Sequence, residues 1–173
     1  EETGLSKGIF GYYWQWLSGM LQGDFGKYYL NGGYRPVSEV LKKCLPPSLF
    51  LILYAQIVAL VLAIPLGLIS AYKENSRFDR ITSSVLFTAV SIPAFVSGII
   101  LSLIFAVQLG WVDPIGYESP FGNTGQHFKL MILPVTSLAI GLTSSYTRLL
   151  RTDVIATLKE DYVTMAASKG ISN

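Results

Sequence analysis

Residues 81–112 read ITSSVLFTAVSIPAFVSGIILSLIFAVQLGWV and contain no Asp, Glu, Lys or Arg. A helix needs about 20 predominantly apolar residues to cross the hydrocarbon core of a bilayer. Two further charge-free stretches, residues 44–72 and 130–147, flank this one in the sequence. The pattern therefore predicts an all-α, polytopic membrane helical bundle. We expect its transmembrane helices at about 48–72, 81–109 and 130–150.

The overall composition agrees with a membrane protein and excludes several other classes. The chain has 173 residues, of which 51% are hydrophobic and 14% are charged, against about 25% charged residues in a soluble domain. The net charge of +2 comes without a basic patch interleaved with aromatic residues, so nucleic acid is not an expected partner. One cysteine, Cys44, and one histidine, His127, cannot form a Cys/His zinc site. No phosphate-binding loop or HExxH motif occurs, so we expect no catalytic residue, no metal site and no ATP hydrolysis by this chain.

Small residues recur at every fourth position within each predicted membrane helix. Such rows let two helix backbones approach closely, which is a main source of helix association in lipid. The rows are Ala55, Ala59, Ala63, Gly67 and Ala71, then Ala94, Gly98, Ser102 and Ala106, then Ser137, Gly141 and Ser145. We expect packing contacts above all at Ala59, Ala63, Gly67, Gly98 and Gly141.

A proline and a few polar side chains interrupt the apolar spans. Pro93 lacks an N–H group, so it should kink or break the second span. Four polar residues are candidates for lining a translocation pathway: Gln56, Ser91, Thr143 and Ser144. The alternative for Gln56 is a hydrogen bond between helices, and for the hydroxyls a bond back to a carbonyl of their own helix.

The segment after the third span has the pattern of an amphipathic helix. Residues 148–173 read RLLRTDVIATLKEDYVTMAASKGISN, and apolar residues recur on one helical face. Thr152 or Asp153 is a candidate N-cap, and Lys169 followed by Gly170 is a C-terminal signal in which the glycine takes a left-handed conformation. The segment either docks on a partner or lies on the membrane surface.

Residues 1–47 form a Gly-rich and aromatic-rich approach to the membrane. Phe10, Tyr13 and Trp14 begin a helical pattern that suggests a short interfacial helix, which glycine-rich turns then end. A second short helix is expected from Pro36 and should stop at Pro46-Pro47. The chain begins Glu-Glu-Thr-Gly without a signal peptide, and we expect it to be an internal piece of a longer protein.

Several motifs together resemble the permease subunits of ABC importers for dipeptides and oligopeptides. Ser91-Ile92-Pro93-Ala94-Phe95 with Gly98 is similar to the Ser-Ile-Pro-x-Phe-x-x-Gly signature of these permeases. Asp161-Tyr162-Val163 and Lys169-Gly170-Ile171-Ser172 resemble the peptide branch of their cytoplasmic EAA loop. Thr164 and Met165 depart from the general Glu-Ala-Ala form, and only Ala166 and Gly170 match it. The resemblance extends to Trp16-Leu17, Gly23-Asp24-Phe25-Gly26, Arg35-Pro36-Val37, Leu45-Pro46 and Leu133-Pro134.

The resemblance implies a fold and a set of partners. The permease of this family has six spans, and these residues look like the second to fourth, followed by a coupling helix in 151–173. A second permease subunit, two ATPase subunits that hold ATP and Mg, and an extracytoplasmic substrate-binding protein would complete the importer. The expected contacts with the ATPase are Leu158, Asp161, Tyr162, Ala166, Lys169 and Gly170. Nickel, opine and glutathione importers share the signatures, so the substrate stays open.

The distribution of basic residues predicts the orientation in the membrane. Lys73–Arg80 carries three basic residues, whereas Gly110–Lys129 carries one, so the first loop and the segment from Arg148 should lie in the cytoplasm. The outer loop Gly110–His127 is either near the binding protein or simply solvated, and His127 is expected at the surface. The competing class is a channel or a secondary transporter outside the ABC family. Such a transporter should carry ionisable residues within its spans, and these spans lack them.

Overall fold

The computed structural model describes residues 8–30 and 32–170, without the side chains of Thr164, Ala166 and Ala167. The chain divides into two compact units, with the boundary between Leu49 and Phe50.

The first unit contains a helix and a small hairpin. Helix α1, Gly8–Leu21, lies where the aromatic pattern predicted a helix. Strands β1, Lys27–Leu30, and β2, Gly33–Pro36, pair antiparallel, with the rings of Tyr29 and Tyr34 edge to face across the pair. This hairpin was not predicted from the sequence, although Asn-Gly between tyrosine-containing segments is a strong hairpin signal.

Helix α2 runs without interruption from Val37 to Tyr72, so the predicted stop at Pro46-Pro47 is wrong. Each proline removes one intrahelical hydrogen bond, which leaves the carbonyls of Lys42 and Lys43 without a helical donor. Both lysines are exposed, so water or lipid headgroups can satisfy these carbonyls.

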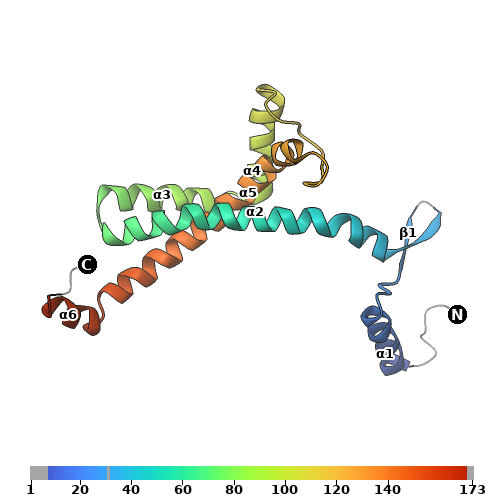
Figure 1. Cartoon of the computed structure of the whole chain (residues 1–173), viewed down its shortest axis with the longest axis horizontal. Helices are drawn as coiled ribbons and strands as arrows, with labels where there is room; N and C mark the ends of the chain where they lie inside the picture. Colours follow the sequence, from blue (N-terminus) through green and yellow to red (C-terminus); the bar gives the residue numbers. More distant parts are fainter. Residues whose placement is uncertain (1–7, 31, 171–173) are drawn as a thin grey trace. The chain divides into compact units, whose positions relative to one another are not determined.

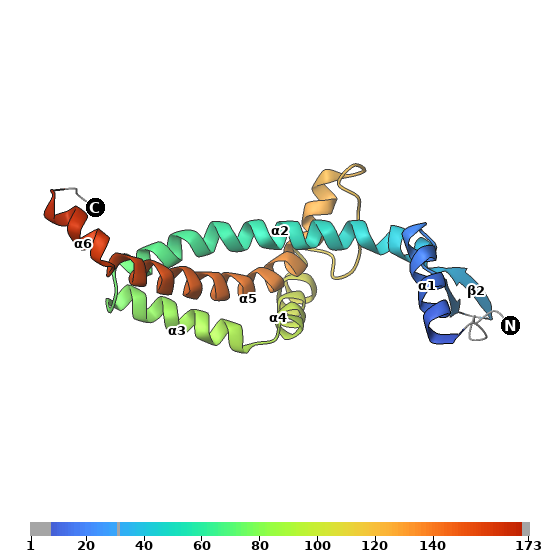
Figure 2. The ribbon, with the colours of Figure 1, turned by 90° about the horizontal axis from the view of Figure 1, so that it is seen from below.

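The second unit is built around helix α5, Thr124–Leu158. Helices α3, Arg77–Ser91, and α4, Ala94–Leu101, pack against α5, and a π-helical segment, η2, Ser102–Gln108, continues α4. Figure 2 shows α5 lying between α3 and the C-terminal part of α2. After two further residues the short helix α6, Asp161–Ser168, turns away from the end of α5 (Figure 1).

The second predicted span is broken in the structure. Helices α3 and α4 meet at Pro93 with a bend of 94°, which agrees with the break expected at this proline. Helices α2 and α5 are long and apolar enough to cross a bilayer, and the bent pair adds a third span if it is counted as one. Many outward-facing apolar side chains, such as Ile52, Val61 and Ile99, are exposed in the isolated chain, as suits a surface that faces lipid or other helices.

The small residues of α2 form a close contact with α5. Ala55, Ala59 and Ala63 are almost fully buried, and a Cβ atom at Gly67 would lie 3.0–3.2 Å from the side chain of Leu150. On α4, a Cβ at Gly98 would lie 3.6 Å from the Ser137 hydroxyl oxygen, an ordinary contact.

The buried row on α5 differs from the predicted one. Of the predicted row, Ser137 is buried beside Gly98, but Ser145 is exposed and a Cβ at Gly141 would meet no atom within 4 Å of the described structure. The longer buried row is the every-fourth series His127, Met131, Val135, Ala139, Thr143 and Thr147. Small size alone did not predict this row, because larger side chains fill most of the space between α5 and its neighbours.

The contact at Gly67 gives a graded prediction. Gly67→Ala should lower the melting temperature of the purified protein, because Leu150 approaches with its Cβ as well as its flexible end and can yield only by a shift of α5. Overpacking of this kind costs about 1–3 kcal/mol. Gly98→Ala should be milder, and Gly141→Ala, the control, should leave thermal unfolding unchanged. Equal melting temperatures for Gly67→Ala and Gly141→Ala would contradict close packing of Gly67 against Leu150.

Candidate functional site

The C-terminal half of α5 extends further than the sequence predicted. Neither Thr152 nor Asp153 is an N-cap, because α5 continues through both residues to Leu158. The Thr152 hydroxyl donates a hydrogen bond to the carbonyl of Arg148 within the helix. No glycine or proline occurs between residues 142 and 169, so nothing in the backbone forces an earlier end.

Helix α6 presents two large side chains that the described chain leaves uncovered. Tyr162 is 62% exposed and Met165 is 59% exposed. Asp161 opens the helix, where a carboxylate favours the positive end of the helix dipole. Gly170 follows with φ +80°, so the predicted left-handed conformation is confirmed.

The other predicted contacts of this segment differ in their surroundings. Leu158 at the end of α5 is half-buried, and Asp161 and Lys169 are exposed. Ala166 lies in α6, but its side chain is outside the described part of the structure. The five residues whose side chains or backbone are described therefore lie at the end of α5, within α6 and just after it.

A buried ion pair joins the start of α3 to α5. Arg151 donates from Nε to Asp79 Oδ1 at 2.6 Å and from a terminal nitrogen to Oδ2 at 2.7 Å. Asp79 is nearly inaccessible to solvent, and it also accepts the backbone N–H of Asn75 at 2.9 Å. Its own N–H bonds to the hydroxyl of the N-cap Ser76. Because a two-pronged guanidinium–carboxylate pair fixes both position and rotation, it holds α3 against α5 at one point.

A second, weaker ion pair lies close to the first in the sequence. Lys159 Nζ, just after α5, is 3.2 Å from Glu74 Oε1 in the turn between α2 and α3. Both side chains are substantially exposed, and exposed pairs contribute little stability. Two ion pairs therefore connect this region to the C-terminal part of α5. The exposed Lys159–Glu74 pair holds the turn between α2 and α3, and the stronger Asp79–Arg151 pair holds the start of α3.

The pathway candidate Gln56 is engaged in a contact between helices. Its amide nitrogen donates to the Tyr146 hydroxyl at 3.0 Å, and that hydroxyl is 3.1 Å from the amide oxygen. This is the alternative that the sequence left open for Gln56, with Tyr146 of α5 as the partner. The Gln56 side chain therefore links α2 to α5.

The three hydroxyl candidates are in different environments and are not brought together. Ser91 is exposed at the break before Pro93 and donates to the Phe87 carbonyl at 2.9 Å. Ser144 is buried and donates to the Ile140 carbonyl. Thr143 is buried, and its hydroxyl has no hydrogen-bond partner among the described residues.

His127 is fully buried, so the expectation of a surface histidine is wrong. Its Nδ1 lies 2.6 Å from the Glu118 carbonyl oxygen, which can only accept, so Nδ1 carries a proton. Nε2 lies 3.2 Å from the Tyr54 hydroxyl. Four aromatic rings meet the imidazole edge to face: Phe50, Tyr54, Tyr117 and Phe128. The histidine thus ties the loop before α5 to α2.

A family model described as "Binding-protein-dependent transport system inner membrane component" matches residues 63–173. That range holds α3, α4, α5 and α6, and it covers more than half of the chain. The chain belongs to this family.

Curated proteins similar to this chain are also permeases. The chain is 35% identical over 172 residues to the oligopeptide transport system permease protein AppB of Bacillus subtilis, covering 98% of this chain and 54% of that protein. It is 33% identical to the glutathione transport system permease protein GsiC of Salmonella choleraesuis, covering 99% and 53%. It is 30% identical to GsiC of Escherichia coli K12, with the same coverage. This permease chain therefore spans about half the length of the curated relatives it matches.

The comparisons confirm the resemblance that the sequence motifs carried. The permease chain is a multi-pass cell-membrane protein of the ABC importer type, with an all-α membrane fold. The competing assignment, a channel or secondary transporter outside this family, is set aside by the match.

Sequence reasoning missed the contacts that involve polar partners far apart in the permease chain. The sequence patterns assigned no role to Asp79, although Ser76 three residues before it is a capping signal. They did not predict Tyr146 as the partner of Gln56. His127 could have been placed by noticing that it begins the buried every-fourth row of α5.

The Asp79–Arg151 pair gives a prediction for the stability of the permease. Arg151→Met should lower the free energy of unfolding by about 3 kcal/mol, since it leaves the buried Asp79 carboxylate without its partner. Asp79→Asn should cost less, because the Arg151 side chain is 26% exposed and water can solvate its guanidinium. The double variant should lose less than the sum of the two. A double-mutant cycle on thermal unfolding of the purified protein measures the coupling. If the losses of unfolding free energy in the two single variants simply add up to the loss in the double variant, the ion pair contributes no coupling energy.

Proposed function

We propose that this chain is a permease subunit of an ABC importer for peptides, and that α6 is the element on which an ATPase subunit acts. The observation that carries the proposal is the pair of exposed side chains, Tyr162 and Met165, on a short helix set off by two residues from a long membrane helix. An exposed aromatic and an exposed methionine on one short helix suit insertion into an apolar groove of a partner. A helix lying on the membrane surface is the alternative for the same side chains.

The helix that leads to α6 is suited to transmit force. Helix α5 is continuous from Thr124 to Leu158, and Arg151 fixes it to α3 two turns before its end. A displacement of α6 would therefore move α5 and α3 together, as expected of packed helices that shift as rigid bodies. In the proposed mechanism, closure of an ATPase dimer displaces α6, and these helices switch the permease between inward and outward states.

The proposed substrate class is a di- or oligopeptide. The relatives named above are called oligopeptide and glutathione permeases, and glutathione is itself a short peptide, so a peptide is the chemistry that both names share. Nickel and opine importers remain alternatives from the sequence signatures. Of the pathway candidates, Ser91 suits this role best, because it is exposed beside the bend at Pro93. Its hydroxyl, like that of Ser144, donates to a carbonyl of its own helix, but Ser144 is buried and Gln56 is bonded to Tyr146.

The proposed assembly needs further subunits. A second permease subunit would complete the pathway, and two ATPase subunits would hold the ATP and Mg. A substrate-binding protein would deliver peptide near the loop between η2 and α5, where Trp111, Ile115 and Phe121 are strongly exposed. This chain itself would then hold no cofactor.

The role of α6 is tested by a matched pair of tyrosines. Tyr162→Ala should weaken association with the ATPase subunit and reduce peptide uptake by about tenfold, because exposed aromatic anchors often carry 1–2 kcal/mol or more of an interface. Tyr72→Ala is the control, since Tyr72 is 63% exposed and lies at the end of α2 that precedes the Glu74 turn. Co-purification with the ATPase and uptake into proteoliposomes are the measurements. Equal effects of the two substitutions would argue that α6 is not the contact.

Gly170→Val tests the end of the same element. A β-branched residue at φ +80° is strained by at least about 1–2 kcal/mol, and the chain after α6 would have to re-route. We expect normal membrane insertion with ATP hydrolysis uncoupled from uptake. A Val variant with wild-type hydrolysis and wild-type uptake would place the contact elsewhere.

The proposed orientation is tested by labelling single cysteines in a Cys44→Ser background. Lys73→Cys and Phe121→Cys are both exposed and take no part in helix capping. An impermeant thiol reagent should label Phe121→Cys in intact cells and Lys73→Cys only after the membrane is opened. Labelling of Lys73→Cys in intact cells would reverse the orientation.

A further inference from the structure

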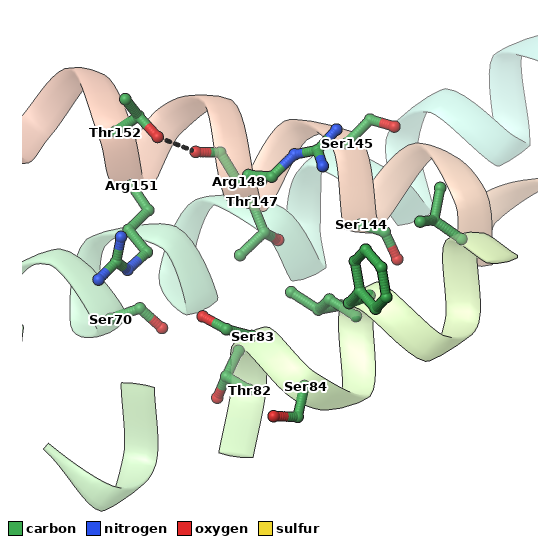
Figure 3. A pocket seen from close by; sticks show the side chains of 13 residues that line it. Ser70, Thr82, Ser83, Ser84, Ser144, Ser145, Thr147, Arg148, Arg151 and Thr152 are labelled. Atoms are coloured by element: carbon green, nitrogen blue, oxygen red, sulfur yellow. Dashed lines mark hydrogen bonds between the residues drawn. The ribbon is translucent and has the colours of Figure 1, made fainter. Parts of the chain in front are cut away.

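A cavity of about 510 Å³ lies between α2, α3 and α5. Its lining is unusual for a membrane helix interface because hydroxyl and guanidinium groups gather in it. Figure 3 shows Ser70 from α2, Ser83 from α3, and Thr147 and Arg151 from α5 turned toward the same space. Arg148 also lines the cavity.

Two of these hydroxyls are buried without a partner. The Ser70 side chain is 0% exposed and Thr147 is 2% exposed. Neither Ser70 Oγ nor Thr147 Oγ1 has a hydrogen-bond partner in the described parts of the chain, although Ser144 in the same lining bonds back to its own helix. Leaving a buried hydroxyl unpaired is costly, and both oxygens are closed to water in this structure, so a ligand in the cavity would bond to them after a small shift of the neighbouring side chains.

The charge of the lining is positive. Arg151 is neutralised by Asp79, whereas the side chain of Arg148 makes no hydrogen bond or ion pair within residues 8–30 and 32–170. None of the described residues that line the cavity is acidic, although Asp79 contacts two of them, Arg151 and Ser83. Two hydroxyl donors and an unpaired guanidinium suit an anion with several acceptor oxygens, such as a phosphate group.

The cavity changes from polar to apolar along α3. Thr82, Ser83 and Ser84 line one end, and Leu86, Phe87 and Val90 line the continuation. At about 1.5 Å rise per residue, Val90 lies roughly 10 Å from Ser83 along the helix. A phosphate bound at the polar end would therefore have an apolar track beside it, which a free phosphate ion would not need.

We propose that this cavity binds the phosphate headgroup of an anionic phospholipid, with one acyl chain along Leu86 and Val90. Basic pockets between membrane helices near the headgroup level recognise lipids in this way. Ser70 and Thr147 donate to the phosphate oxygens, and Arg148 supplies the positive charge. The proposal does not depend on the role of α6.

The test uses the complete, purified transporter and phosphatidylglycerol as the probe. Native mass spectrometry and thermal unfolding are recorded with phosphatidylglycerol, with phosphatidylcholine, and with inorganic phosphate alone. We expect saturable stabilisation by phosphatidylglycerol, which Arg148→Gln weakens about fivefold. Arg80→Gln is the matched control, because Arg80 is exposed on α3 but does not line the cavity.

A second variant reports on the buried hydroxyls. Thr147→Val keeps the shape of the side chain and should weaken phosphatidylglycerol binding without lowering the melting temperature of the lipid-free protein, because the hydroxyl has no described protein partner to lose. Equal binding by wild type, Arg148→Gln and Thr147→Val would overturn the site. Equal stabilisation by inorganic phosphate would make the ligand a soluble anion, and equal stabilisation by phosphatidylcholine would remove the role of charge; either result overturns the lipid assignment.

Discussion

The ion pair between Asp79 and Arg151 is the constraint on which the second unit depends. Apart from the Gln56–Tyr146 and His127–Tyr54 hydrogen bonds and the exposed Lys159–Glu74 pair, the described helices touch through small residues, hydroxyls and apolar side chains, which tolerate sliding along the helix axis. A bidentate pair between a nearly buried carboxylate and a guanidinium does not, because both oxygens and two nitrogens must stay in register. It fixes the start of α3 at one height on α5, and the capping contacts of Ser76 and Asn75 fix the turn that precedes it.

The other contacts of α5 take their position from one helical row. His127, Met131, Val135, Ala139, Thr143 and Thr147 are buried at every fourth position, and Arg151 follows one turn later. The side chains of that row change in character along α5. His127 lies among aromatic rings, the next three residues are apolar, Thr143 and Thr147 follow, and Arg151 forms the ion pair. One face of a single helix thus meets the loop before α5, the membrane helices, the hydroxyl-lined cavity and the first turn of α3 in succession.

The sequence predicted what depends on local pattern and missed what depends on distant partners. Charge-free runs located the helices of the membrane, Pro93 located the break, and Gly170 located a left-handed residue. The predicted helix end at Pro46-Pro47 and the predicted N-cap at Thr152 were wrong. Whether a proline ends a helix, or a threonine caps one, depends on whether the surrounding structure leaves the nearby backbone groups unpaired. The pairs Asp79–Arg151 and Gln56–Tyr146 join residues 72 and 90 positions apart, and no periodicity within one helix can reveal them.

The central claim is that α3 and α5 move as one body when α6 is displaced. Distances between spin labels on Val85→Cys in α3 and Thr157→Cys in α5 test it directly, in the assembled transporter with and without trapped ATP. Both positions are exposed, and neither takes part in the ion pair. The account predicts one distance distribution in both states, and a distribution that changes with ATP once Asp79→Asn is introduced. A distance that already changes with ATP in the otherwise wild-type protein would show that α5 moves independently of α3 and would contradict the account.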